Sequence, residues 1–443
     1  MNTSALPPIP TDDAMRHELH NEVHARPPAR VRLPALITYV AVLNTAVTRE
    51  QECFHLAQLP GHAQLQPTQL QGNFLRLRCD GFTVKWERHT EFTRYSIVQR
   101  LPGHGHWGAK QPELASHVAT GLDWLRGIPG NTVAAIHLAM LTEGMGEGDM
   151  LAQAQQWLGD GIVIGSHMGN NAQGQSHSCL LTHFLIGDDG FERMLVLTQG
   201  ETPEGRAGRI SQRVLELETY RLMALRGLPV AKALSPQLAS AESRLADIAA
   251  RLDTKQGSDQ ELLDDLVALA ARVERATAEH GYRFSATRAY DAVLRERITE
   301  LRERPVHGTQ TVGEFMQRRI GPAMATVAAT AQRLGALSER IARTSALLRT
   351  RVDIATETQN QQLLEKLTRG QELQLRLQST VEGLSIAAIS YYVVTLILYG
   401  AKALSKLGLA LHPELVAGLS IPLVVFAVWK TVQRIHARIR SSE

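Results

Sequence analysis

Cysteine is scarce in this 443-residue chain, which contains three: Cys53, Cys79 and Cys179. They are widely spaced and form no CxxC motif, so the sequence predicts neither a disulfide framework nor a zinc ribbon. Such sparse thiols suit a reducing cytoplasm. The N-terminal residues also lack a basic stretch followed by an apolar core, so we expect no secretory signal peptide.

Motifs of common enzyme chemistry are missing as well. There is no P-loop, no GxGxxG before a predicted helix and no GxSxG nucleophile elbow. We therefore expect a protein that is not an enzyme. The formal net charge is only +3, and the basic residues are spread along the chain or gathered near its end. This distribution disfavours a nucleic-acid partner.

A strongly apolar C-terminal end is the main feature that is present. The segment Leu384–Ala401 has 18 residues without a charge, within the length range of a transmembrane helix, and a second apolar segment runs from Leu415 to Trp429. We expect two transmembrane helices within residues 384–430, in contact with the lipid bilayer. The tail, residues 431–443, is basic, so both termini are expected in the cytoplasm.

Upstream, residues 1–30 predict an N-terminal arm with a short helix, and residues 31–232 predict a cytoplasmic sheet-and-helix domain. Short β-branched stretches alternate with helix-like stretches in this domain, which favours an α/β or α+β fold, and α+β is our choice. Strands are expected at 36–43, 73–79, 82–88, 92–99, 132–140, 161–165, 178–186 and 191–197, and helices at 48–59, 113–125, 149–158 and 206–226. In the last helix, Glu216, Glu218 and Arg221 are expected to pair on a solvated face.

The composition then shifts to alanine, leucine, arginine and glutamate with helical periodicity. Residues 236–312 predict a helical hairpin, with helices at 238–252, 259–279 and 282–303. Residues 314–383 predict a stalk helix that continues without a break into the first apolar segment.

Three histidines, His17, His20 and His24, are spaced i, i+3, i+7 on one face of the predicted N-terminal helix. Imidazoles at this spacing can converge on one metal ion. The alternative is a solvated or interface face. Five further histidines (His104, His106, His167, His177 and His183) are too scattered to indicate a site.

A polar stripe follows the stalk and the first apolar segment at heptad spacing, which keeps one face of a helix toward a bundle axis. It is neutral in the middle and acidic at its cytoplasmic end, and it indicates a pore lining. Its residues are Lys402, Tyr399, Thr395, Tyr392, Ser385, Gln378, Gln374, Gln371, Leu367, Leu364, Asn360, Glu357 and Asp353. A neighbouring face with Glu365, Glu382 and Ser390 is the alternative lining. Helix–helix packing alone explains either stripe equally well, and a pore requires an oligomer.

Several segments resemble a bacterial family of uncharacterised membrane-anchored proteins whose domain has no known function. They include His24-Ala-Arg-Pro27, Trp86-Glu-Arg-His-Thr-Glu-Phe92, the segment from Gly208 to Tyr220, and the segment from Val381 to Tyr392. This resemblance covers almost the whole chain. It implies a membrane location and no activity. Together with the two predicted spans, it leads us to expect a multi-pass protein of the bacterial inner (cytoplasmic) membrane.

The C-terminal architecture resembles CorA-type divalent-cation channels. Tyr399-Gly400 matches the first two residues of that family's Tyr-Gly-Met-Asn motif. The resemblance implies a homo-oligomer, a pentamer in that family, and a divalent cation as a possible ligand. The motif's Met-Asn is here Ala401-Lys402, and a ring of lysines would repel cations. Magnesium selectivity therefore does not carry over.

These observations together predict a homo-oligomeric inner-membrane ion channel or transporter of CorA-like architecture with altered selectivity. The alternative is a membrane-anchored scaffold or ligand-sensing protein without transport activity. The oligomeric state separates the two, because two membrane helices of a single chain enclose no pore.

Overall fold

The structure is a computed structural model, and it describes residues 12–22, 27–101, 119–142, 147–169, 176–254, 256–406 and 412–440. The chain forms two compact units. The first comprises Met1–Lys255 and Asp264–Arg343, and the second comprises Gln256–Leu263 and Thr344–Glu443.

A nine-stranded sheet is the centre of the first unit, with the strand order β2-β3-β4-β1-β5-β8-β7-β6-β9. The pair β5–β8 is parallel and the other pairs are antiparallel. The strands are β1 (Ala35–Leu43), β2 (Phe74–Arg78), β3 (Phe82–Arg88), β4 (Phe92–Arg100), β5 (Asn131–Thr142), β6 (Ile164–Met168), β7 (Ser178–Ile186), β8 (Glu192–Thr198) and β9 (Arg304–Pro305).

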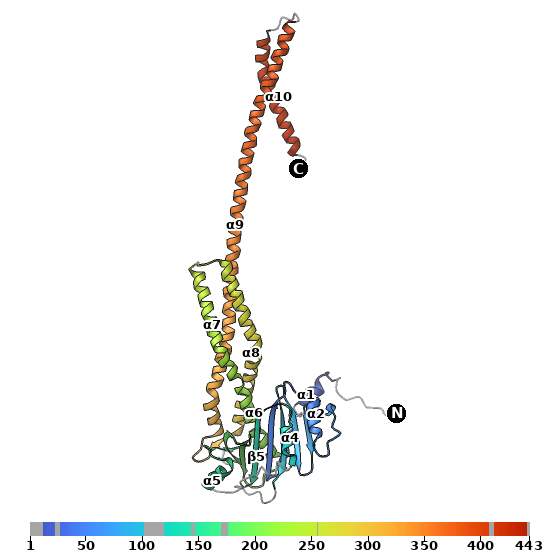
Figure 1. Cartoon of the computed structure of the whole chain (residues 1–443), viewed down its shortest axis with the longest axis vertical. Coiled ribbons are helices and arrows are strands. Elements are labelled where there is room, and N and C mark those ends of the chain that lie inside the picture. Colours follow the sequence, from blue (N-terminus) through green and yellow to red (C-terminus); the bar gives the residue numbers. More distant parts are fainter. Residues whose placement is uncertain are drawn as a thin grey trace, which may run out of the picture. The chain divides into compact units, whose positions relative to one another are not determined.

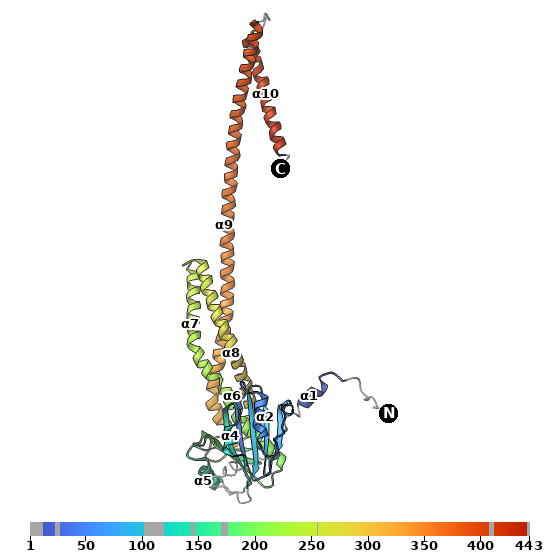
Figure 2. The ribbon, with the colours of Figure 1, turned by 45° about the vertical axis from the view of Figure 1, so that its right-hand side comes forward.

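The side chains of β1 point alternately to the two faces of the sheet. Ile37 and Tyr39 are buried on the face that packs against α6 (Glu204–Leu225). Val40 and Val42 point to the opposite face, because successive strand residues alternate between faces. Helices cover that opposite face too: α2 (Arg49–Ala57), η1 (Pro67–Leu70), α4 (Leu122–Arg126) and α5 (Glu147–Leu158). Figures 1 and 2 show this sheet with helices on both sides.

The predicted strands are confirmed except for the bounds of β6. That strand was expected at residues 161–165 but lies at Ile164–Met168. Its position is set by long-range pairing, since Ser166 and His167 pair with Pro305 and Arg304 of β9. Strand pairing between distant segments carries no local sequence signal.

Three helices pack together beyond the sheet: α7 (Gly227–Asp253), α8 (Asp259–Leu301) and the first part of α9 (Val312–Lys406). Arg333 of α9 donates to Glu242 of α7 at 2.7 Å, and Arg244 of α7 donates to Asp265 of α8 at 2.8 Å. Figure 1 shows α7 and α8 as an antiparallel pair, which confirms the predicted helical hairpin.

Two predicted helix boundaries in this region are wrong. The helices expected at 259–279 and 282–303 form one helix, α8, because the single glycine Gly281 costs too little to end it. The helix expected at 238–252 begins earlier, at Gly227 directly after α6. Pro229 lies in its first turn, where the missing N–H has no partner to lose. Elsewhere in the chain, the helix predicted at 113–125 is helical at 119–120 and from Leu122 onward, with an interruption at Gly121, and residues 113–118 lie outside the described residues.

The second unit contains the rest of α9 and α10 (Pro413–Arg440). The prediction that the stalk runs into the first apolar segment is confirmed, because α9 is one helix from Val312 to Lys406. Both helices are long and apolar enough to cross a membrane. An α+β sheet domain followed by long helices and two apolar helices is therefore the observed architecture. The short N-terminal helix is also present, as α1 (Arg16–Glu22).

Candidate functional site

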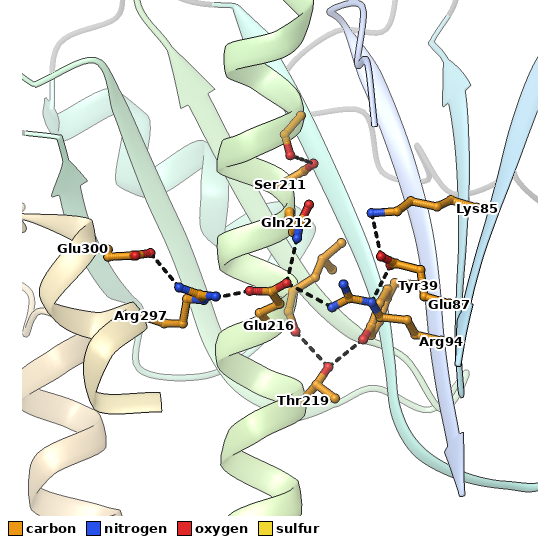
Figure 3. Close-up of polar contacts among 12 residues, drawn as sticks. Tyr39, Lys85, Glu87, Arg94, Ser211, Gln212, Glu216, Thr219, Arg297 and Glu300 are labelled. Atoms are coloured by element: carbon orange, nitrogen blue, oxygen red, sulfur yellow. Dashed lines mark hydrogen bonds and ion pairs between the residues drawn. The ribbon is translucent and has the colours of Figure 1, made fainter. Parts of the chain in front are cut away.

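A cluster of buried charged side chains lies between the sheet and α6. We call it the Arg94 cluster, and Figure 3 shows it. The register of the sheet builds it, since Glu87 of β3 lies directly opposite Arg94 of β4 and Lys85 lies opposite Ser96. Its members are Lys85, Glu87, Arg94, Gln212, Glu216, Arg297 and Glu300.

Arg94 connects the sheet to α6. Its Nε donates to Glu87 on the neighbouring strand, and its Nη1 lies 3.2 Å from Oε1 of Glu216 on α6. The Nζ of Lys85 lies 3.1 Å from the other carboxylate oxygen of Glu87. Each of these four side chains is at most 5% exposed, so the ion pairs are isolated from solvent.

Glu216 in turn links α6 to α8. Arg297 of α8 donates through Nε to Oε2 of Glu216 at 2.8 Å, and Gln212 donates to Oε1 at 2.8 Å. Arg297 also lies 3.1 Å from Glu300, one turn along α8. The Arg94 cluster therefore joins three layers of the first unit: the sheet, α6 and α8.

The pKa values in the cluster favour the charged forms of its carboxylates. Burial opposes ionisation of Glu87, but Arg94 and Lys85 outweigh it, so the pKa of Glu87 lies below its usual value. Burial likewise opposes ionisation of Glu216, and Arg94 and Gln212 hold its pKa low. Burial also disfavours charge on Arg94, yet the neighbouring acids raise its pKa well above the usual value.

The space beside the cluster is small. The cavity lined by Lys85, Arg94, Ser96 and Gln212 has about 20 Å³ available to water, room for about one molecule. The described lining contains no cysteine or histidine. The arrangement suits a rigid connection between layers, and it has no room for a substrate.

A second buried pair of acids lies further along α6. Glu192 of β8 and Glu218 of α6 are 4% and 1% exposed and share a hydrogen bond. Burial raises the pKa of Glu192 well above its usual value, and the negative charge of Glu218 raises it further. Arg221 donates to Glu218 through both Nε, at 2.6 Å, and Nη2. The environment of Glu192 therefore favours its protonated form.

The expectation that Glu216, Glu218 and Arg221 pair on a solvated face is wrong. Glu218 and Arg221 do pair, but on a buried face, and Glu216 pairs with Arg94 and Arg297 instead. Two signals in the sequence pointed to this. Apolar residues surround both acids on α6, and the strand segment Val84-Lys-Trp-Glu87 places charges on one face and apolar residues on the other. A strand that is buried on both faces must pair its charges.

The predicted stripe on α9 is uncovered in the single chain. Every side chain from residue 353 to residue 381 is exposed, and so are Ser385, Tyr392, Tyr399 and Lys402. Thr395 is half-buried, and its hydroxyl donates to the carbonyl of Tyr391 at 2.7 Å. The Lys402 ammonium lies 5.9 Å from the centre of the Tyr399 ring. These contacts are within α9, so no other element of the described chain occupies the stripe.

The alternative lining has a different environment. Ser390 is 5% exposed, Glu382 is half-buried and Glu365 is exposed. On the same side of α9 Ala401 is buried, and Ala417 and Val424 are buried on α10. Figures 1 and 2 show α10 folding back beside the end of α9. The helix pair thus covers the Ser390 side of α9 and leaves the predicted stripe open.

The histidine site remains a prediction. His17 and His20 lie on α1, where the Nε2 of His17 is 3.0 Å from Asp12, and His24 lies outside the described residues. Within the described ranges, no group of three or more histidine, cysteine, aspartate or glutamate side chains is placed to hold a metal ion. His104 and His106 also fall outside the described residues.

Comparison with known proteins gives one match. A family model with the description "Protein of unknown function (DUF3422)" matches residues 11–439. No curated protein sequence and no solved structure is significantly similar to the chain. The expected resemblance to a family without a known function is therefore confirmed over nearly the whole chain, and that family description carries no activity.

Proposed function

We propose that this chain, which belongs to the family described as Protein of unknown function (DUF3422), is a homo-oligomeric ion channel or transporter of the bacterial inner membrane. In this proposal α9 and α10 cross the membrane, both termini are cytoplasmic, and copies of α9 surround the ion pathway. The architecture is that of the CorA-type channels, with a different selectivity.

The uncovered polar stripe on α9 carries the proposal. Tyr392 lies near the middle of the apolar segment and is 68% exposed, on the side of α9 that α10 leaves open. A hydroxyl without a partner costs about 4 kcal/mol or more in hydrocarbon. Polar groups at this depth therefore face protein or water rather than lipid. A ring of α9 helices satisfies this requirement.

The stripe also has the sequence of environments that conduction needs. Lys402 lies at its outer end, and Gln371, Gln374 and Gln378 form a neutral stretch on the cytoplasmic side. Asp353 and Glu357 follow, and their negative charge attracts cations at that end. Leu364 and Leu367 are candidates for an apolar constriction that gates by dewetting.

Ion flux into liposomes that contain the full-length protein tests the proposal. Thr395→Leu narrows and dries the pathway, so we expect flux to fall several-fold. Lys402→Asn removes a positive ring, so we expect cation flux to rise relative to anion flux. Leu396→Val is the matched control, because Leu396 is exposed on a different face of the same turn. If neither substitution changes an observed flux, this lining is wrong.

A second candidate function is a membrane-anchored scaffold or ligand sensor without transport activity. The Arg94 cluster favours it, because ion pairs that join the sheet, α6 and α8 can transmit a displacement of the sheet to a long helix. Absence of flux for every ion tested, together with capture of a soluble partner by the full-length protein, would select this function.

A further inference from the structure

The stretch of α9 just before the apolar segment has an uncharged face. In heptad positions a to g, with Asn360 at a, positions a are Asn360, Leu367, Gln374 and Val381, and positions d are Leu363, Gly370, Leu377 and Leu384. We call these eight residues the a/d face. None of them carries a charge, and the four leucines are 57–74% exposed in the single chain.

Most charged residues of this stretch lie away from the a/d face, while Lys366, at a g position, flanks it. Glu365 and Glu372 occupy f positions, and Arg369 and Arg376 occupy c positions. This division makes the stretch amphipathic, and amphipathic helices bury their apolar side against a partner. In proteins, packing of such an amphipathic face supplies most of a helix's stability.

We propose that the a/d face binds the same face of other copies of this chain, in parallel and in register. This inference rests on the proposed function for the membrane insertion of α9, and it adds the contact by which the copies associate. The d positions pack between neighbouring copies and the e positions turn toward the axis. The a positions lie between them, so Leu367 and Gln374 of the predicted stripe take part in both.

Three observations select a second copy as the partner. First, the a/d face ends where the apolar segment begins. Copies inserted in one bilayer with the same orientation therefore place the same residues at the same height, which fixes a parallel, in-register arrangement.

Second, the polar residues of the face complement themselves. The side-chain amides of Asn360 and Gln374 each contain a donor and an acceptor, so identical amides at one height can bond to each other. A buried polar residue at an a position is a known determinant of register in coiled coils. A Cβ at Gly370 would meet no neighbouring atom within 4 Å, so this position has open space in which a second helix can approach closely.

Third, α10 covers a different side of α9 and leaves the a/d face open. Ser390 and Ala401, which are buried where α10 folds back, occupy c and g positions when the same heptad is continued. Tyr391 continues the d positions and is 69% exposed. The hairpin partner and the proposed neighbouring copies therefore contact different sides of the helix.

Cysteine cross-linking of the full-length protein in membranes tests the a/d face. Leu377→Cys places a thiol at a d position, and Ser379→Cys places one at an f position on the opposite side as the matched control. The wild-type chain measures the background of the three native cysteines, of which Cys53 and Cys179 are buried. With a mild oxidant, we expect a disulfide-linked dimer for Leu377→Cys at least five-fold above Ser379→Cys.

Co-expression of differently tagged Leu377→Cys and Leu384→Cys chains tests the register. Two helical turns separate these positions by about 10 Å, beyond the reach of a disulfide. Two Leu377→Cys chains, or two Leu384→Cys chains, should therefore cross-link with each other. A Leu377→Cys chain should not cross-link with a Leu384→Cys chain. Equal cross-linking of like and unlike pairs would overturn the in-register arrangement.

The outcomes also separate this inference from the proposed function. Strong Leu377→Cys cross-linking without ion flux supports the a/d face and contradicts the channel. Ion flux in an oligomer that cross-links equally through Leu377→Cys and Ser379→Cys, or through Ser379→Cys alone, contradicts the a/d face. That result is still compatible with the channel. Covalent capture of a different protein by Leu377→Cys would contradict self-association.

Discussion

At the scale of single residues, Arg94 is the side chain on which the interior of the sheet unit most depends. It is the common partner of Glu87 and Glu216, both of them buried acids on different elements. Removal of one partner from a buried ion pair leaves an uncompensated charge, which is far more costly than loss of an exposed pair.

We therefore expect Arg94→Ala to lower the free energy of unfolding by about 3–5 kcal/mol. Arg126→Ala is the control, because its ion pair with Asp123 is exposed and 3.7 Å long and should contribute less than about 1 kcal/mol. Denaturant unfolding in detergent, followed by fluorescence of buried Trp86, measures both. Equal losses in the two variants would contradict the role given to Arg94.

The Glu192–Glu218 pair makes stability depend on pH. The pKa of Glu192 is raised in the folded state, so its contribution is fully present below the unfolded pKa of about 4.3 and is lost as the pH rises toward the raised value. Glu218, Arg221 and Thr182 are the groups that face it. The direction of the effect follows from burial and from the charge of Glu218.

Glu192→Gln should mimic the protonated acid and remove this dependence. We expect the variant to match the wild type near pH 4 and to become more stable than it as the pH rises, by up to about 1.4 kcal/mol per pH unit. Glu339→Gln, at a 73% exposed position, is the control. Unfolding curves collected from pH 4 to pH 9 measure the difference. Parallel pH profiles for wild type and Glu192→Gln would show that Glu192 is ionised.

Single residues were also where prediction from the sequence was weakest. Glu216 and Glu218 have the composition of a solvated helical face, and only the fold reveals that β4, α8 and β8 supply partners for them. Strand register is a long-range property, so no local pattern pairs Glu216 with Arg94, 122 positions away. The stripe on α9 could be predicted because it depends only on helical periodicity.

At the scale of elements, α6 is positioned by a close approach to the backbone at Ala29, in the segment that precedes β1. A side chain at Gly208 would place its Cβ within 1.6 Å of the carbonyl oxygen of Ala29, while the same atom at Gly205 meets only the end of Arg209 at 3.8 Å. Both glycines are in the same helix, so they differ in packing and not in helix propensity.

This contrast gives a matched pair of variants. Gly205→Ala should be neutral or stabilise the protein by up to about 1 kcal/mol, because alanine favours the helix. Gly208→Ala gains the same propensity but forces α6 away from Ala29, so we expect a net loss of about 1–3 kcal/mol. Thermal unfolding of the two variants in detergent measures this difference. Stabilisation by both substitutions would contradict the close contact.

Most elements followed from the sequence because their signals are local. Short β-branched stretches predicted β2 and β3, and Gly81 in the turn between them has the positive φ of +81° that a tight hairpin turn uses. The errors have physical reasons of another kind. Gly281 does not break α8, and β6 is placed by its partner strands rather than by its own residues.

At the scale of the whole molecule, the account depends on several copies of the chain. One chain supplies two apolar helices, and the open side of α9 carries Tyr392, Tyr399 and an uncharged a/d face. The sequence predicted the long helix and its stripe. It could not show which side α10 covers, because that depends on how the two helices pack.

The oligomeric state of the full-length protein in lipid nanodiscs tests this central claim most directly, by native mass spectrometry. We expect a closed assembly of several identical chains, a pentamer if the resemblance to CorA-type channels extends to stoichiometry. Leu377→Glu, which places like charges on the a/d face, should dissociate it, while Ser379→Glu should not. A wild-type protein that is monomeric in nanodiscs would contradict both the pathway along α9 and the contact between copies.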